Sequence, residues 1–150
     1  MMTIRLRLSL DSKMLKKTDS IVCLDVGEKR IGLSIGNSSV RIAVPFETIE
    51  VDGYEIKAIT DIVIRESADI LVIGYPRNQS GDATAQTKFV EEFADKLSGV
   101  APKIVFQDES LTSVIAEQRL ISYKRPYSKG DIDAQAAAII LQDYLEANYA

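Results

Sequence analysis

Two short apolar runs separated by a glycine turn mark the first strands of the domain. Residues 21–25 and 31–36 are mostly apolar or small, and Gly27 lies between them. This pattern predicts a hairpin of two buried strands. Residues 40–51 are also typical of an extended segment, but Pro45 removes a backbone donor there, which favours a strand at the edge of a sheet. Because short turns join these strands, we expect them to form an antiparallel meander.

After residue 53 the apolar residues recur at helical spacing. This change predicts a helix over residues 56–67. Residues 69–73 then form a short continuous apolar run, which predicts a strand buried on both faces. A loop marked by glycine and proline over residues 74–82 leads to a predicted helix over residues 83–97.

The remaining chain predicts one more strand and two helices. Residues 103–106 indicate a second buried strand, and acidic residues follow it directly. A short helix is expected over residues 112–121, and residues 122–130 form a polar, basic loop. The final helix is expected over residues 131–147, with Asp131 as its N-cap. Its many alanines allow it to lie close to a sheet.

The predicted fold class is α/β. Three antiparallel strands come first, and the β-α-β-α-β portion that follows adds two parallel strands through right-handed crossovers. The result is a mixed five-stranded sheet flanked by helices. With 150 residues the chain is one domain by length, which we place at residues 20–150. Residues 1–19 are expected to be a flexible basic N-terminal extension, in which Met14 is a second candidate start.

The composition excludes several kinds of chemistry. The chain has no histidine and a single cysteine, Cys23. This excludes Ser-His-Asp and Cys-His catalysis, zinc sites that need imidazole or several thiolates, and an internal disulfide. Carboxylates, lysines, hydroxyls and hard cations remain. A lone cysteine suits a reducing cytoplasm, and no apolar run reaches the length of a membrane span, so we expect no membrane partner.

The charge is distributed unevenly along the chain. The net charge is −4, which disfavours a general nucleic-acid binder with a basic face. Residues 47–69 are rich in acids, however, whereas residues 119–129 carry four basic side chains and no acid. The positive charge is therefore concentrated in particular segments.

Four acidic residues fall at the ends of predicted elements. Asp25 ends the first strand, and Asp108 and Glu109 end the last. Asp133 lies in the first turn of the final helix. Sites in such sheets form outside the carboxyl ends of the strands, and converging carboxylates repel one another unless a divalent cation lies among them. The pattern favours a Mg²⁺ or Mn²⁺ site for phosphodiester hydrolysis, and the alternative is that these are turn-capping and surface acids.

Four motifs, in order and in register, resemble those of the YqgF family of Holliday-junction-resolvase-like proteins, also described as pre-16S rRNA nucleases. They are DVGEKRIG (25–32), GYPRNQSG (74–81), DESLTS (108–113) and KGDIDAQAAAIILQDYL (129–145). The resemblance implies an RNase H-like fold and a cytoplasmic endonuclease that matures the 5′ end of precursor 16S rRNA during ribosome biogenesis. Branched DNA is an alternative substrate, ribosomal particles are potential partners, and the protein would be a monomer or a homodimer.

The resemblance also implies roles for individual residues. Asp25, Glu109 and Asp133 match the acids that would bind Mg²⁺ or Mn²⁺, and Asp108 matches a fourth catalytic acid beside them. A metal-bound water would then be the nucleophile. Five further residues are candidates for binding substrate: Arg30, Arg77, Asn78, Arg125 and Lys129.

Four of these five residues also have a structural explanation, and for Lys129 it is that the amine neutralises the nearby acids. Arg30 equally suits an ion pair with a surface acid, Asn78 an Asx turn, and Arg125 a solvated loop. The chain departs from the family pattern at two positions, because Ser110 stands where an arginine is usual and Arg77 stands where a leucine is usual. These two changes move a positive charge, so they relocate a phosphate contact or alter the substrate preference without removing a carboxylate.

Two other functions compete with the nuclease. A non-catalytic module that binds RNA or the ribosome would explain the net acidity and Ser110. An ATPase of the actin and sugar-kinase type would explain the Asp-x-Gly turn at Asp25, but such enzymes need two domains around the nucleotide. Cleavage and ATPase assays distinguish the three classes.

Overall fold

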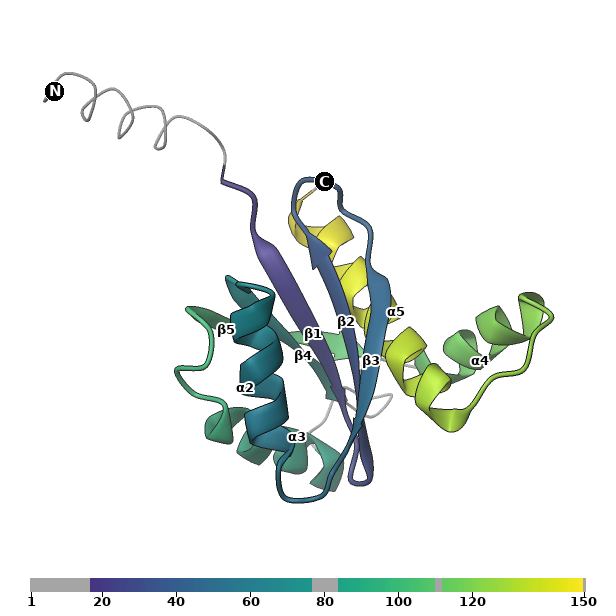
Figure 1. The fold of residues 1–150 in the computed structure, drawn as a ribbon, viewed down its shortest axis with the longest axis horizontal. Helices are drawn as coiled ribbons and strands as arrows, with labels where there is room; N and C mark the ends of the chain where they lie inside the picture. The colour runs from purple at the N-terminus through teal and green to yellow at the C-terminus, as the bar shows by residue number, and fades with distance from the viewer. Residues whose placement is uncertain (1–16, 77–83, 110–111, 150) are drawn as a thin grey trace, which may run out of the picture.

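Five strands form one sheet in the order β3-β2-β1-β4-β5 (Figure 1). They are β1 (Ser20–Val26), β2 (Arg30–Asn37), β3 (Val44–Glu50), β4 (Ile70–Pro76) and β5 (Lys103–Glu109). β1, β2 and β3 pair antiparallel, whereas β4 pairs parallel with β1 and β5. This is the mixed sheet that the sequence predicts. The computed structural model describes residues 17–76, 84–109 and 112–149, so Arg77, Asn78 and most of the predicted N-terminal extension lie outside the described residues.

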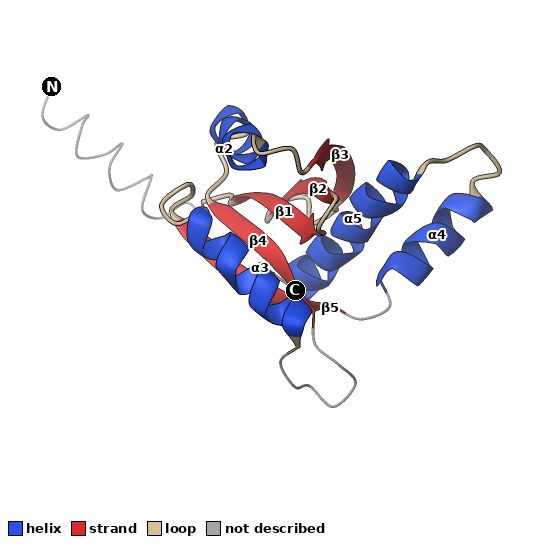
Figure 2. Ribbon diagram, turned by 90° about the horizontal axis from the view of Figure 1, so that it is seen from below, coloured by secondary structure: helices blue, strands red, loops and turns tan. Residues whose placement is uncertain are grey.

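The described helices cover both faces of the sheet. They are α2 (Glu55–Arg65), α3 (Ala85–Lys96), α4 (Thr112–Ser122) and α5 (Lys129–Asn148). In Figure 2, α2 and α3 lie on one side of the sheet and α5 on the other, and α4 lies beyond α5. None of the helices in the described parts of the chain is long and apolar enough to span a membrane.

Strand alternation divides the core into two layers. In β1, Val22, Leu24 and Val26 pack with α2 and α3, whereas Ile21 and Cys23 pack with α5. Successive side chains of a strand point to opposite faces, so the next residue in phase with Ile21 and Cys23 also faces α5. That residue is Asp25.

The structure corrects the predicted start of the final helix. α5 begins at Lys129, and its N-cap is Ser128 rather than Asp131. The Ser128 hydroxyl accepts from the backbone N–H of Asp131, while the Asp131 carboxylate accepts from the backbone N–H of Ser128 at 2.9 Å. Such a capping box is stronger than a single cap, because it satisfies two backbone donors. Asp133 therefore lies at the start of the second helical turn rather than in the first.

The structure also corrects the burial of the last strand. β5 was expected to be a buried strand, but it pairs only with β4 and forms an edge of the sheet. Phe106, for example, is 44% exposed. An apolar run cannot distinguish a central strand from an edge strand that has one covered face. The prediction for β3 is confirmed, since the strand that contains Pro45 forms the opposite edge.

Candidate active site

Asp25 lies where α5 comes closest to the sheet. Its partner in the β1–β2 pairing is Gly32, which is fully covered by α5. A methyl group added at Gly32 would overlap the backbone carbonyl group of Asp133. Glycine at this position therefore lets α5 rest directly on β2, and it is this contact that brings the Asp133 side chain near Asp25.

Glu109 approaches Asp25 from the other side of the sheet. It ends β5 in phase with Val105, which packs toward α5, and β4 separates it from β1. A methyl group added at Gly74 in β4 would overlap Glu109 Oε2 and lie 2.8 Å from Ile140 Cδ1. The Glu109 side chain therefore lies across Gly74, and its carboxyl group is hydrogen-bonded to that of Asp25.

Burial and the charge of a neighbouring carboxylate raise the pKa of both Asp25 and Glu109, although the hydrogen bond from Glu109 by itself lowers the pKa of Asp25. Burial is the largest cause in each case, and the total effect raises the pKa of Asp25 to about 6 and that of Glu109 to about 8. The nearby Asp133 charge contributes to the shift of Asp25, and the Asp25 charge contributes to that of Glu109. Near neutral pH the pair therefore holds about one proton, since two buried carboxylates in contact do not both ionise readily.

Asp133 is held by an ion pair rather than by the other acids. Arg30 Nε donates to Asp133 Oδ2 at 2.6 Å, and the side chains are 31% and 23% exposed. The hydrogen bond and the charge of Asp133 raise the pKa of the Arg30 guanidinium. Of the two roles expected for Arg30, the described structure contains the ion pair, and its partner is one of the predicted metal ligands.

Asp108 lies apart from this group. It precedes Glu109 in β5, so its side chain points to the opposite face of the sheet, the face of α2 and α3. It is exposed. The structure thus brings together Asp25 and Glu109, with Asp133 beside them, and places Asp108 outside the group.

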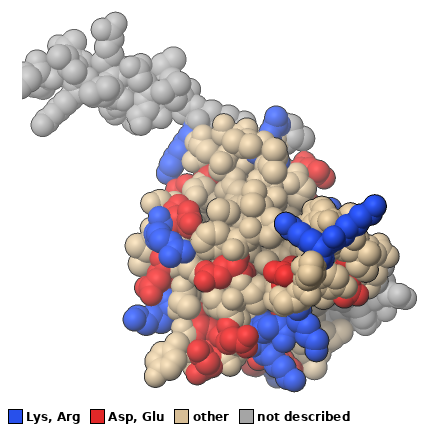
Figure 3. All heavy atoms as spheres, turned by 45° about the vertical axis from the view of Figure 1, so that its right-hand side comes forward, with Lys and Arg blue, Asp and Glu red and all other residues tan. Residues whose placement is uncertain are grey.

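Two of the predicted substrate-binding residues, Lys129 and Arg125, lie at or just before the start of α5. Lys129 begins α5 and is exposed. Arg125 lies in the α4–α5 connection, with its guanidinium 5.4 Å from the centre of the Tyr123 ring. Figure 3 shows basic and acidic side chains of the described residues interspersed over one face of the molecule, without one continuous basic patch among them. Arg77 and Asn78 lie outside the described residues.

The side chains of Asp25, Glu109 and Asp133, which we call the acid group, offer oxygen ligands to a cation. Glu109 Oε2 is sealed from solvent and has no hydrogen-bond partner, and among the described residues it is the only side-chain polar atom of this kind. A buried polar atom left unpaired is costly, and carboxylate oxygens are the ligands that Mg²⁺ and Mn²⁺ prefer. In the described residues, however, no three acids stand close enough together to hold one ion, because Asp133 is turned toward Arg30. The donor set therefore fits a hard cation, with Asp25 and Glu109 as the positioned pair.

Two glycines that build this site were not predicted as site residues. Gly32 was expected to serve backbone geometry or close approach of nucleic acid, and Gly74 was assigned to the start of a loop. Both lie inside strands on the face of α5. A glycine in a strand interior often marks the close approach of another group. Both glycines lie on the same face of the sheet as Asp25, and this shared face was the signal that could have identified them.

Comparison with known proteins identifies the family. A family model described as RuvX, Holliday junction resolvase, matches residues 19–147. The chain belongs to this family. A relative from Chloroflexus aurantiacus named "Putative pre-16S rRNA nuclease" is 43% identical over 133 residues, which cover 85% of this chain and 86% of the relative. A protein of the same name from Rippkaea orientalis is 38% identical, with 85% of this chain and 96% of the relative covered. The predicted membership in the RuvX (YqgF) family of nucleases is confirmed.

Solved structures confirm the fold. RuvC of T. thermophilus, in complex with a Holliday junction substrate, matches with a TM-score of 0.54 at 12% identity, covering 85% of this chain and 94% of that one. The fowlpox virus resolvase, in complex with Holliday junction DNA, matches with a TM-score of 0.52 at 12% identity, covering 85% and 97%. The RuvX chain thus has the RNase H-like fold of these resolvases.

Proposed function

We propose that this RuvX-family chain is a Mg²⁺- or Mn²⁺-dependent endonuclease that cuts phosphodiester bonds at the 5′ end of precursor 16S rRNA. The names of its relatives support the RNA substrate. The complexes of resolvases that share its fold support branched DNA as the second candidate substrate. With precursor rRNA as its substrate, the protein would act in the cytoplasm and would meet ribosomal particles during their assembly.

The Asp25–Glu109 pair carries the proposal. Two carboxyl groups from strands that are not neighbours lie in contact at the carboxyl ends of parallel strands, and Glu109 Oε2 has no hydrogen-bond partner among the described residues. Burying such a pair costs folding free energy, so the arrangement is retained for something other than stability. A divalent cation would give the unpaired oxygen a partner and would offset the repulsion.

The residues of the chain have distinct tasks in this proposal. Asp25 and Glu109 would hold the cation, and Asp133 would complete the set of acids. Arg30 orients the Asp133 carboxylate through their 2.6 Å hydrogen bond and is itself 31% exposed on the side chain, so one side of the guanidinium faces outward to substrate. A bound cation supplies a Lewis acid for phosphodiester hydrolysis.

A cleavage assay with matched variants tests the function. Precursor 16S rRNA and a Holliday junction are incubated with the wild-type protein in Mg²⁺, in Mn²⁺ and in a chelator. We expect cleavage only with a divalent cation, and none with Asp25→Asn or Glu109→Gln. Asp61→Asn removes an exposed acid of α2 and should cleave as the wild type does.

The outcomes separate the hypotheses. Unchanged cleavage by Asp25→Asn would reject the site. Cleavage of the junction but not of the rRNA would assign branched DNA as the substrate. RNA binding without cleavage under any condition would favour a non-catalytic module.

A further inference from the structure

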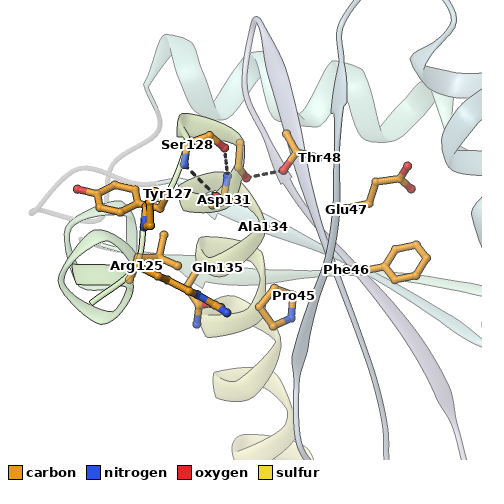
Figure 4. A pocket seen from close by; sticks show the side chains of 13 residues that line it. Pro45, Phe46, Glu47, Thr48, Arg125, Tyr127, Ser128, Asp131, Ala134 and Gln135 are labelled. Carbon is orange, nitrogen blue, oxygen red and sulfur yellow. Dashed lines mark hydrogen bonds between the residues drawn. The ribbon is translucent and has the colours of Figure 1, made fainter. Parts of the chain in front are cut away.

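A cavity of about 610 Å³ lies beside the acid group, between the edge strand β3 and the α4–α5 connection. Its apolar wall includes Pro45, Leu120 and Ala134, and its polar lining includes Arg125 and Gln135. Figure 4 shows the Arg125 and Gln135 side chains next to each other, directed into the space between α5 and Pro45. The Tyr127 hydroxyl points away from this space. None of these residues belongs to the acid group.

Gln135 is the unusual member of the lining. Its side chain is in the second turn of α5 and the residue is only 5% exposed, yet its amide makes no hydrogen bond to any other described residue. The amide is not sealed, because Glu109 Oε2 is the only sealed, unpaired side-chain atom in the described parts of the chain. The Gln135 amide therefore opens only into the cavity. It offers a donor and an acceptor there, and neither has a hydrogen-bond partner among the residues that the structure describes.

The polar groups of the lining suit a planar ligand. The Glu47 side chain is directed away from the cavity in Figure 4, and the Asp131 carboxylate accepts from the backbone N–H of Ser128. This leaves the Arg125 guanidinium and the Gln135 amide. A planar ring with donors and acceptors at its edge could use the amide and the guanidinium together. Arginine planes and amides are the groups that stack on and hydrogen-bond the bases of unpaired nucleotides.

The cavity wall is aligned with Asp25 across neighbouring strands of the sheet. Thr48 of β3 pairs with Gly32, and Gly32 pairs with Asp25, so the cavity wall and the acid lie in one line across the sheet. Thr48 Oγ1 also donates to the Gly130 carbonyl at 2.5 Å, which fixes the start of α5 against β3. Strands are about 4.8 Å apart, so two strands place the cavity about 10 Å from Asp25. A nucleic-acid strand that passes over the start of α5 can span that distance with about three nucleotides at a stacked spacing of about 3.4 Å.

We infer that this cavity binds an unpaired nucleobase of the strand that is cut at the acid group. The inference rests on the proposed function, but it concerns binding rather than cleavage. It assigns Gln135 and Arg125 to base recognition and predicts that the enzyme prefers a substrate with an unpaired nucleotide close to the cut.

A binding experiment tests this without any cleavage. Fluorescence anisotropy measures the affinity of the full chain, in a chelator, for labelled single strands of about eight nucleotides, a length within the usual range of single-strand sites. Homopolymers of each base are compared with a strand of equal charge in which every base is replaced by a tetrahydrofuran spacer. We expect at least one base to bind about tenfold more tightly than the spacer strand.

Variants assign the difference to the cavity. Gln135→Leu keeps the size and burial of the side chain but removes the amide. Arg125→Ala leaves the core intact, because Arg125 lies in the exposed α4–α5 connection. Both should abolish the preference for a base over the spacer. Gln118→Leu on the exposed side of α4 and Lys57→Ala on α2 are matched controls, and they should keep it.

Two results would overturn the inference. One is equal affinity of the wild type for base and spacer strands, or no affinity for either. The other is a base preference that survives both cavity variants. Either result leaves the proposed nuclease standing, because that proposal is decided by cleavage in the Asp25 variant.

Discussion

Replacing Gly32 with alanine asks whether the contact between α5 and the sheet builds the candidate site. The added methyl group would overlap the carbonyl carbon and oxygen of Asp133. These are backbone atoms, so no side-chain rotation can relieve the overlap. Relief requires α5 to move away from β2, and this movement would carry Asp133 away from Asp25.

The expected cost follows from two opposing effects. Alanine in place of glycine lowers the entropy of the unfolded chain, which stabilises a compatible position by about 0.4–1 kcal/mol. Overpacking that forces a backbone shift costs about 1–3 kcal/mol or more. Since the overlap here involves backbone on both sides, we expect the upper end of that range and a net loss of about 2 kcal/mol in the free energy of unfolding.

Gly36 provides a matched control. It lies on the same strand and the same face, but its added methyl group would lie 3.1 Å from the Ile42 carbonyl oxygen and 3.3 and 3.4 Å from methyl groups of Leu141 and Leu145. These leucine side chains can adjust by a few tenths of an ångström. We expect Gly36→Ala to change the free energy of unfolding by less than about 1 kcal/mol.

Urea denaturation followed by circular dichroism measures both variants, and a cleavage assay accompanies it. Gly32→Ala should be the less stable of the two and should lose activity even in conditions where it is folded. Equal stability of the two variants would refute the close contact between α5 and β2 as the feature that positions Asp133.

Three further predictions concern the acids themselves. Gly74→Ala should displace the Glu109 carboxyl group rather than a backbone, so cleavage should fall while urea denaturation shows a loss of less than about 2 kcal/mol. Arg30→Ala breaks a half-exposed pair, so it should cost no more than about 1 kcal/mol in the same assay, yet it should reduce cleavage more than Arg30→Lys does. Without metal, the folded state holds a proton on Glu109 more tightly than the unfolded state does. Stability from this group should be complete below its ordinary pKa of 4.5 and should be lost as the pH rises toward about 8. Melting curves should show that fall in the wild type and a smaller one in Glu109→Gln, because Asp25 keeps its raised pKa there. Addition of Mn²⁺ to the wild type should raise the melting temperature at pH 8, and a wild-type profile without a fall would contradict the shifted pKa.

The sequence predicted the elements of the fold because each has a periodic apolar pattern and a clear turn at its ends. The mixed five-stranded sheet followed from the order of those elements, whereas the RNase H-like class was implied by the four motifs that resemble the YqgF family. The start of the final helix was predicted wrongly because two nearby residues could both serve as its N-cap. Ser128 and Asp131 are both good N-caps, and the capping box uses both, which only the structure could show.

The candidate site was predicted in part. Strand and helix ends identified four acids, and the resemblance to the YqgF family singled out Asp25, Glu109 and Asp133. The structure places these three close together. Asp108 and Glu109 are adjacent in sequence, but the strand alternation that sends them to opposite faces depends on the phase of β5 relative to α5. The 2.6 Å contact between Arg30 and Asp133 joins residues 103 positions apart, and no local pattern specifies such a pair.

The order in which the chain is made gives the position of α5 a biological meaning. α5 follows all five strands in the sequence, and it supplies Asp133 together with the cover for Ile21, Cys23, Ile70 and Val72. A nascent chain that has not yet released this helix from the ribosome would have one bare apolar layer and an incomplete set of acids. One core layer and the candidate site would therefore be completed together, by the packing of a single helix.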